Sequence, residues 1–277
     1  MVVSVNTNYA AMIALQSLNS SSSSLQSTEN QISTGLAVAN AKDNSSVWAI
    51  AQNQRADVSS LTAVQQSLNR AASVADVASS AGQSISDLLV SMRQKVVAAM
   101  DTSIDQTSRN ALNDDFQSLV KQVGSVIQNA SFGGTNILDG SLTSNIQFLA
   151  DSDATTRITL SVQNMSLGGS IITIPATATI STATAASAML SLLDASITNT
   201  DSSLAELGSQ QSHIEAHNTF VSKLMDVLQS GIGNLVDADM AKESAKLQAL
   251  QVQQQLGAQS LSIANSAPQI VLSLFRG

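Results

Sequence analysis

A long run of regularly spaced apolar and small residues constrains the fold of this chain more than any other feature. Such residues recur at alternating steps of three and four positions, while Asp, Arg, Gln and Ser fill the positions between them. The twelve positions are Leu61, Val64, Leu68, Ala71, Ala75, Ala78, Gly82, Ile85, Leu89, Met92, Val96 and Ala99. This period places them on one stripe of a helix and predicts a rod of about 58 Å that packs against another helix.

A second series with the same period follows later in the chain. Its members are Leu190, Leu193, Ile197, Thr200, Leu204, Leu207, Gln211, Ile214, Asn218, Val221, Met225, Leu228, Ile232 and Leu235. Polar residues inside such a seam fix the register between helices at some cost in stability, and Gln211 and Asn218 fit this role. Between the two series, a shorter helix ending at Asn129 is predicted, with Ser103 and Gln106 forming a capping box at its start.

The two seams together predict one antiparallel bundle, because a short link after a long helix implies an antiparallel neighbour. The residues expected at the core of this bundle are Leu61, Val64, Leu68, Ile85, Leu89, Met92, Leu204, Leu207, Ile214 and Met225.

The two ends of the chain are almost free of charge. No Asp, Glu, Lys or Arg occurs in residues 1–28 or 247–275, although both stretches carry spaced aliphatic residues. We expect two helices that are buried together and against further copies, because a charge-free surface avoids the desolvation penalty of dense contacts. The residues expected to make these contacts are Leu18, Leu25, Ile32, Leu250, Leu256, Leu261, Ile263 and Leu272.

Glycine and polar residues mark the boundaries between these helices. Gly35 can end the first helix in the left-handed conformation, and Asp43, Asn44 or Ser45 can cap the next one. Gly231, Gly233 and Asp237 mark a second boundary, before the charge-poor final helix.

The middle of the chain changes to a period of two, which is typical of strands. Ile158, Leu160 and Val162 alternate with polar residues, and a similar alternation covers residues 172–180. With a turn at Gly168-Gly169 and an edge position for Pro175, residues 131–180 are predicted to form a small β-hairpin region.

The composition gives little support for chemistry. The chain has no Cys and a net charge of −8, and its basic residues never cluster, which argues against thiolate sites and nucleic-acid binding. His213 and His217 share a helix face, but no third metal ligand has an obvious place. No apolar run is long enough to span a bilayer. We therefore expect a protein that is not an enzyme, without metal, cofactor or membrane insertion.

These features predict a mainly α fold. It is an elongated antiparallel α-helical coiled-coil bundle with a small β-hairpin region, and the N- and C-termini are paired at one end.

Several short motifs resemble bacterial flagellin, in the order in which they occur in that family. They are residues 5–8 (VNTN), 32–35 (ISTG), 40–43 (NAKD), 49–51 (AIA), 131–138 (SFGGTNIL), 235–243 (LVDADMAKE) and 264–274 (ANSAPQIVLSL). The resemblance covers most of the chain except 141–185. The short middle and the Lys42-Asp43-Asn44 sequence look most like alphaproteobacterial flagellins.

The resemblance implies a division of the chain into inner and outer tube domains. Residues 1–44 would form the N-terminal part of the inner tube domain and a connecting spoke, with Gly35, Lys42 and Asp43 at this boundary. Residues 45–130 would supply the N-terminal helices of the outer domain, 131–182 its β-hairpin region and 183–233 its C-terminal helix. Residues 234–277 would complete the inner tube domain.

The resemblance also implies a function and partners. The chain would be an extracellular structural subunit that polymerises, alone or with sibling flagellins, into the helical filament used for swimming. The implied partners are an export chaperone, the type III export apparatus, and the cap and hook–filament junction proteins. In the segment that the vertebrate innate receptor recognises, Leu89 and Arg93 match the family, but Ser91 and Lys95 replace the usual Arg and Leu. Weak receptor recognition is therefore expected.

Two other functions fit parts of the pattern. A hook–filament junction protein shares the same chain ends, although the compact middle and the nearly complete set of motifs favour the filament subunit. A secreted coiled-coil translocator would need a membrane-active helix, and the sequence has no apolar run long enough to span a bilayer.

Overall fold

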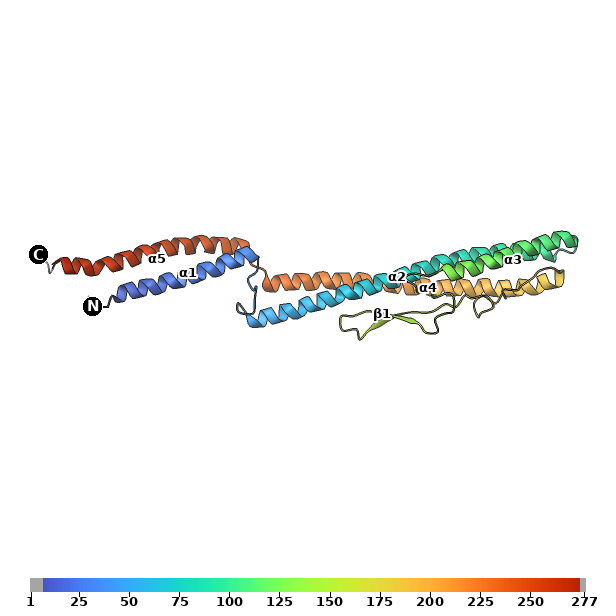
Figure 1. The fold of residues 1–277 in the computed structure, drawn as a ribbon, viewed down its shortest axis with the longest axis horizontal. Coiled ribbons are helices and arrows are strands. Elements are labelled where there is room, and N and C mark those ends of the chain that lie inside the picture. Colours follow the sequence, from blue (N-terminus) through green and yellow to red (C-terminus); the bar gives the residue numbers. More distant parts are fainter. Residues whose placement is uncertain (1–6, 275–277) are drawn as a thin grey trace. The chain divides into compact units, whose positions relative to one another are not determined.

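The computed structural model describes residues 7–274, with the side chains of residues 7–266. In this part of the chain the elements are α1 (Tyr9–Thr34), α2 (Ser45–Met100), α3 (Gln106–Asn129), β1 (Ile146–Leu149), β2 (Arg157–Leu160), α4 (Ala183–Val236) and α5 (Met240–Leu274) (Figure 1). They form two compact units. We call Asp57–Asp226 the central unit, and the residues up to Ala56 and from Val227 onward the terminal unit. The predicted mainly helical fold is confirmed.

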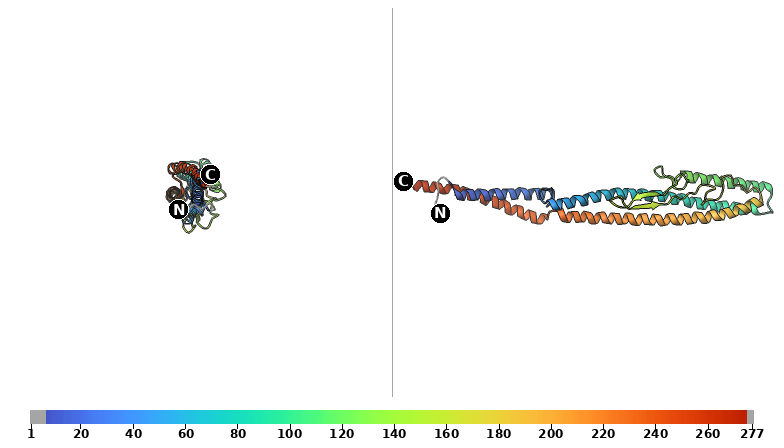
Figure 2. Two further views of the ribbon diagram at one scale, coloured as in Figure 1. Left: turned by 90° about the vertical axis from the view of Figure 1, so that its left-hand side faces the viewer. Right: turned by 90° about the horizontal axis from the view of Figure 1, so that it is seen from below.

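The central unit is built on the seam between α2 and α4, which lie side by side in Figure 1 and in the right-hand view of Figure 2. All twelve seam positions predicted on α2 are buried. On α4, Leu207 and Ile214 are fully buried, whereas Leu204 and Met225, also predicted for the core, are half-buried at the edge of the seam. At Gly82 the helices approach closely, because an added Cβ would lie 2.6 Å from Leu204 Cδ2.

The turn between α2 and α3 differs from the prediction. The N-cap of α3 is Asp105 and not Ser103, because the helix begins at Gln106 and the Asp105 carboxylate accepts a hydrogen bond from the Ser108 N–H. This backbone hydrogen bond lowers the pKa of Asp105. Arg109 is buried beneath the turn and donates to the carbonyl oxygens of Ala99 and Asp101, so it satisfies backbone groups at the end of α2.

Only the first half of the predicted hairpin region pairs as strands. β1 and β2 are antiparallel, with Ile146 opposite Leu160 and Leu149 opposite Arg157. In the loop between them, the Asp151 carboxylate accepts from the Thr155 and Thr156 backbone N–H groups and from the Thr155 hydroxyl. These hydrogen bonds lower the pKa of Asp151 to about 2.

The second predicted strand, over residues 172–180, is wrong. Ile172, Ile174 and Ile180 are buried as the alternation indicated, but the segment has no strand partner. Its backbone bonds to helix side chains instead: the Thr173 N–H donates to Ser196 Oγ, and the Ile180 N–H donates to Asn113 Oδ1. The alternation with a period of two therefore predicted correctly which side chains face the core. It did not predict which groups form hydrogen bonds with the backbone.

Candidate assembly surface of the terminal helices

Helices α1 and α5 form an antiparallel pair in the terminal unit (Figure 1). Asn8 caps α1 by accepting from the Ala11 N–H, and its amide nitrogen donates to the Ala264 carbonyl oxygen at 2.6 Å. Further along, Leu18 packs on Gly257, where an added Cβ would lie 3.3 Å from Leu18 Cδ1. The expected pairing of the two chain ends is thus present in a single copy of the protein.

The interface of this pair is thin. On α1 only Ser21 and Thr28 are buried, and none of the side chains described on α5 is buried. Of the residues predicted to make the assembly contacts, Leu18, Leu25, Ile32, Leu250 and Leu261 are half-buried. Leu256 and Ile263 are exposed, and Leu272 lies outside the side chains that the structure describes. One copy therefore covers only part of the apolar surface of its own terminal helices.

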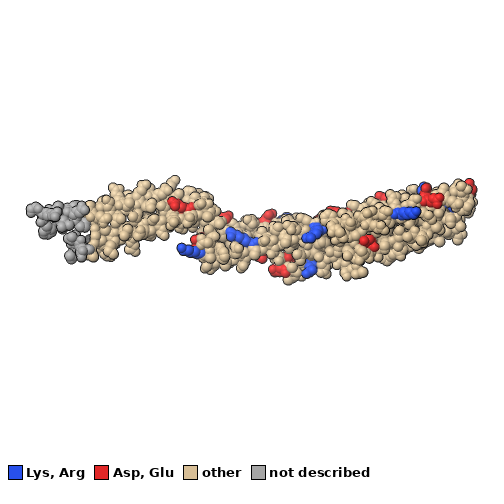
Figure 3. Space-filling view, in the orientation of Figure 1, with Lys and Arg blue, Asp and Glu red and all other residues tan. Residues whose placement is uncertain are grey.

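The uncovered surface is large and apolar. Tyr9, Met12, Ile13, Val252, Leu256 and Ile263 expose between 52% and 73% of their surface. Ile13 and Leu256 help to line a shallow hollow of about 450 Å³ between the helices. On the visible face in Figure 3, the paired helices carry almost no charged side chain. Exposed apolar patches of this kind mark interaction sites in soluble proteins. We call this patch the terminal apolar face.

The connection between the terminal helices and the long helices is ordered by backbone hydrogen bonds. Gly35 ends α1 with φ 72° and bonds back to Gln31, as predicted. Leu36 forms an antiparallel bridge with Asp237, and the Ala37 N–H donates to the Val236 carbonyl oxygen at 2.7 Å. Asp239 accepts from the backbone N–H groups that follow it and so caps α5. The second boundary therefore lies at residues 237–239, because α4 continues through Gly231 and Gly233.

The other predicted boundary residues have local roles. The Asp43 carboxylate accepts from the Ala39 and Asn40 N–H groups, which shapes the turn before α2. Lys42 is exposed and donates its backbone N–H to Asn40 Oδ1. Of the three predicted caps for α2, Asn44 accepts from the Val47 N–H.

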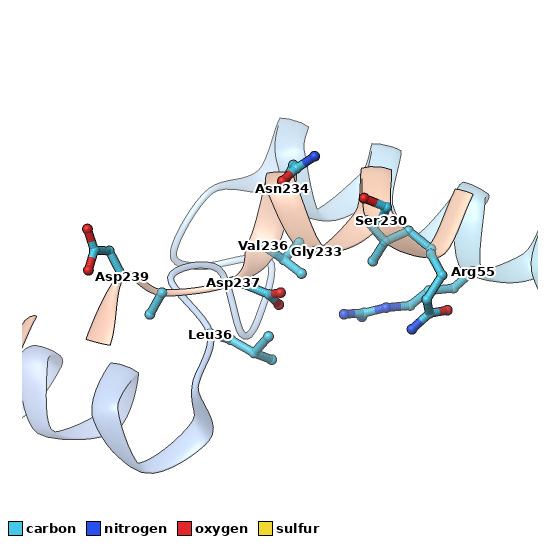
Figure 4. Close-up of a pocket in the computed structure, with 11 residues that line it drawn as sticks. Leu36, Arg55, Ser230, Gly233, Asn234, Val236, Asp237 and Asp239 are labelled. Atoms are coloured by element: carbon cyan, nitrogen blue, oxygen red, sulfur yellow. The ribbon is translucent and has the colours of Figure 1, made fainter. Parts of the chain in front are cut away.

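A hollow of about 710 Å³ lies beside this connection, with Leu36, Arg55 and Asp237 among its lining residues. In Figure 4 the Arg55 side chain extends toward Asp237. Asp237 packs closely on Gly233, where an added Cβ would lie 2.7 Å from the carboxylate.

The remaining residues singled out in the sequence are spread over the central unit. Leu89 is fully buried, the Ser91 hydroxyl donates to the Asp87 carbonyl oxygen, and Arg93 and Lys95 form exposed ion pairs with Asp194 and Asp115. The two histidines do not act together. His217 bonds to the Ala150 carbonyl oxygen in the hairpin loop at 2.7 Å, whereas His213 is exposed.

Comparison with known proteins decides what kind of assembly these helices serve. The sequence profile of the bacterial flagellin N-terminal helical region matches residues 5–143, and that of the C-terminal helical region matches residues 190–275. The chain belongs to the bacterial flagellin family. It is 50% identical over 279 residues to flagellin FljJ of Caulobacter vibrioides, and the match covers the whole of both chains.

More distant relatives place this flagellin among those of alphaproteobacteria. It is 37% identical to a flagellin of Brucella melitensis over the full length of both chains. It is 33% identical to flagellin C of Rhizobium meliloti, covering 99% of this chain and 100% of that one. This confirms the predicted resemblance to alphaproteobacterial flagellins.

Solved structures agree with the fold. A crystal structure of Bacillus cereus flagellin aligns with a TM-score of 0.50 and 21% identity, covering 56% of this chain and 88% of that chain. A Vibrio parahaemolyticus chain described as a flagellar hook-associated protein aligns with a TM-score of 0.59 and 13% identity, covering 70% of this chain and all of that chain. At these identities the likeness concerns the fold alone.

As a flagellin, the protein is a structural subunit of the extracellular flagellar filament. Among the residues that the structure describes, no helix has the length and hydropathy needed to cross a membrane. Within the same residues, no three His, Cys, Asp or Glu side chains come together in a cluster suited to a metal ion.

Proposed function

We propose that the terminal apolar face is the surface through which copies of this flagellin polymerise. The single observation that carries the proposal is the exposure of large aliphatic and aromatic side chains on a helix pair with almost no charge. Contact with neighbouring copies buries these side chains, and burial of apolar area is the main driving force for association. The stretches that carry this face, residues 9–28 and 247–266, have no charged side chain that would have to be desolvated.

In this proposal the terminal helices line the inner tube of the filament. Residues 1–44 and 234–277 make up the inner tube domain and its spoke. Residues 45–130, 131–182 and 183–233 make up the outer domain. Head-to-tail contacts between copies do not close on themselves, so they produce an open helical polymer. Because one copy buries so little of α1 and α5, the pair gains most of its order when it docks.

The remaining partners follow from this role. Before assembly the exposed terminal helices need protection, which an export chaperone supplies in the cytoplasm, and the subunit leaves through the type III export apparatus. At the ends of the filament it contacts the cap and the hook–filament junction proteins, and it can mix with sibling flagellins. The protein acts as a structural subunit and not as an enzyme.

Recognition by the innate receptor is proposed to be weak. Leu89 is buried in the seam and offers no surface to a receptor. Arg93 and Lys95 are already paired with carboxylates, so a receptor has to compete with these ion pairs. A cell-based receptor assay with purified monomer, compared with a strongly activating flagellin, tests this point, and strong activation by the monomer would refute it.

Charge placed on the terminal apolar face tests the assembly proposal. Ile13→Asp combined with Leu256→Asp puts two carboxylates into the proposed contact, which should abolish filaments in electron micrographs and leave a soluble monomer. Removal of residues 247–277 should do the same. The matched control is Thr143→Asp, which adds an acidic group in an exposed loop of the central unit and should leave polymerisation intact.

The proposal fails if the doubly substituted chain forms filaments of normal length. Circular dichroism of each variant shows whether the helices of the central unit remain folded, so that a general loss of structure is not mistaken for a loss of assembly.

A further inference from the structure

Five hydrogen bonds between α2 and α4 obey one numerical rule. They join Gln65 to Ser222 at 2.8 Å, Asn69 to Asn218 at 2.7 Å, Asp76 to Gln211 at 2.6 Å, Ser86 to Asp201 at 3.2 Å, and Arg93 to Asp194 at 2.7 Å. In every case the two residue numbers add up to 287. We call this set the register ladder.

A constant sum means that the two antiparallel helices keep a single register from Gln65 to Arg93. The ladder includes Gln211 and Asn218, the two polar residues inside the apolar seam of α4, and the structure supplies their partners, Asp76 and Asn69. Polar groups at such positions specify how helices pair where another register would place an apolar side chain opposite them, because the hydrogen bond between the helices is then lost.

The apolar seam alone does not define this register well. A shift of α4 by seven residues returns seam positions to seam positions, because both series follow the same period. In one direction Leu204, which now lies over Gly82, would meet Leu89, and the space for it is lost. In the other direction Leu204 would meet Ala75, which is small enough to accept it.

Two bonds of the register ladder, Asp76–Gln211 and Arg93–Asp194, oppose this second, sterically permitted shift. After the shift, Asp76 would face Leu204 in place of the Gln211 amide. Arg93 would face Ser187 and lose the carboxylate of Asp194. The other three bonds would find new polar partners, because Gln65 would face Glu215, Asn69 would face Gln211 and Ser86 would face Asp194. The Asp76–Gln211 and Arg93–Asp194 pairs therefore distinguish two registers that share one apolar period.

We infer that the register ladder selects one axial register of α2 against α4. Each copy of the central unit then has the same length, which a helical polymer of identical subunits requires. On this account the ladder contributes specificity and little net stability, as polar residues in helix seams commonly do.

Engineered cysteine pairs report the register directly, because the chain has no Cys. The pair Gln65→Cys/Ser222→Cys reports the observed register. The pair Gln65→Cys/Glu215→Cys reports the shifted one. Positions seven residues apart on a helix differ by about 10 Å along the axis, whereas a disulfide needs Cα atoms within about 7 Å. Both reporters remove the Gln65–Ser222 bond of the ladder, and the second also removes the hydrogen bond that Gln211 donates to Glu215.

The test compares the two reporters in the otherwise natural chain and in a chain with Asn69→Leu, Asp76→Leu, Gln211→Leu and Asn218→Leu. Mild oxidation of the natural background should crosslink only the first pair. In the leucine background, crosslinking of the shifted pair should rise about fivefold, because the Asp76–Gln211 hydrogen bond no longer discriminates. The melting temperature should stay equal or increase.

Two results would overturn the inference. If the leucine background still crosslinks only the Gln65→Cys/Ser222→Cys pair, the connecting segments and Gly82 set the register. If instead the melting temperature falls while the crosslinks do not change, the ladder serves stability. Should the fourfold variant fail to fold by circular dichroism, Asp76→Leu with Gln211→Leu asks the same question with a smaller change.

Discussion

The central and terminal units of this flagellin are built from the same kind of helix but differ in how much one copy can bury. On α2, a full row of seam residues is inaccessible to solvent, and the hairpin and α3 cover further apolar side chains. On α1 and α5, two small polar residues are the only buried side chains among those described. The difference supports the proposal that the central unit folds for itself, whereas the terminal unit is completed by other copies.

The largest expected effect compares one leucine from each unit. Leu68→Ala removes a fully buried side chain of the central seam and should lower the free energy of unfolding of the monomer by about 2–5 kcal/mol. Leu25→Ala removes a half-buried side chain of α1 and should change monomer stability far less. Chemical denaturation measures the first effect. If both variants lost the same free energy of unfolding as monomers, the contrast between the two units would be contradicted.

Substitution of two glycines tests how tightly the seam between α2 and α4 is packed. Gly82→Ala places a methyl group 2.6 Å from Leu204 Cδ2, so the Leu204 side chain must move, and after the gain in helix propensity the central unit should be destabilised by about 0.5–1 kcal/mol. Gly208→Ala is the control on the partner helix, because nothing lies within 4 Å of its added Cβ. It should stabilise the protein by about 0.5–1 kcal/mol through helix propensity. Thermal melts of both variants provide the measurement, and a stabilising Gly82→Ala would contradict close packing at this site.

In the loop between β1 and β2, the reverse substitution, from alanine to glycine, should stabilise the protein. Ala154 has φ 56°, a left-handed conformation that costs a residue with a Cβ about 1 kcal/mol. Ala154→Gly should therefore raise the stability of the central unit by a few tenths to about 1 kcal/mol, and polymerisation should not change. A loss of stability in denaturant titrations would show that the side chain makes a contact that outweighs the strain.

The smallest effect concerns acid. The pKa of Asp151 is lowered to about 2 by hydrogen bonds from Thr155 and Thr156, from an unfolded value of 3.8. A lowered folded pKa means that the contribution of this carboxylate is complete above pH 4 and is lost as the pH falls toward 2. In Asp151→Asn this part of the acid dependence should disappear. Hydrogen exchange or NMR of the loop between pH 4 and pH 2 follows it, and an identical acid response in both proteins would rule it out.

Periodicity predicted the central seam because a single physical rule, apolar burial every three or four residues, decides it. The same reasoning failed at Pro175 and its neighbours. A period of two identifies a buried side but cannot show that Asn113 and Ser196, distant in sequence, satisfy the backbone in place of a strand. The cap of α3 was misplaced for a similar reason, because Ser103 and Asp105 are both good caps and only the exact first residue of the helix separates them.

The terminal residues show a different limit of the sequence. The absence of charge predicted that the chain ends are buried. The flagellin motifs predicted that a filament of further copies buries them. The pattern could not say how much of that burial one copy achieves. Leu256 and Ile263 remain exposed because α5 has only α1 to pack against in a single chain. A register role was predicted for the seam residues Gln211 and Asn218, whereas their partners became visible only in the structure.

Hydrogen–deuterium exchange on monomer and filament tests the central claim most directly. In the monomer, amides of α1 and α5 should exchange much faster than those along the seam of α2 and α4. After polymerisation, the terminal helices should become protected, while the seam changes little. If α1 and α5 are already as protected in the monomer as the seam is, or stay unprotected in the filament, the account of a terminal unit completed by neighbouring copies is contradicted.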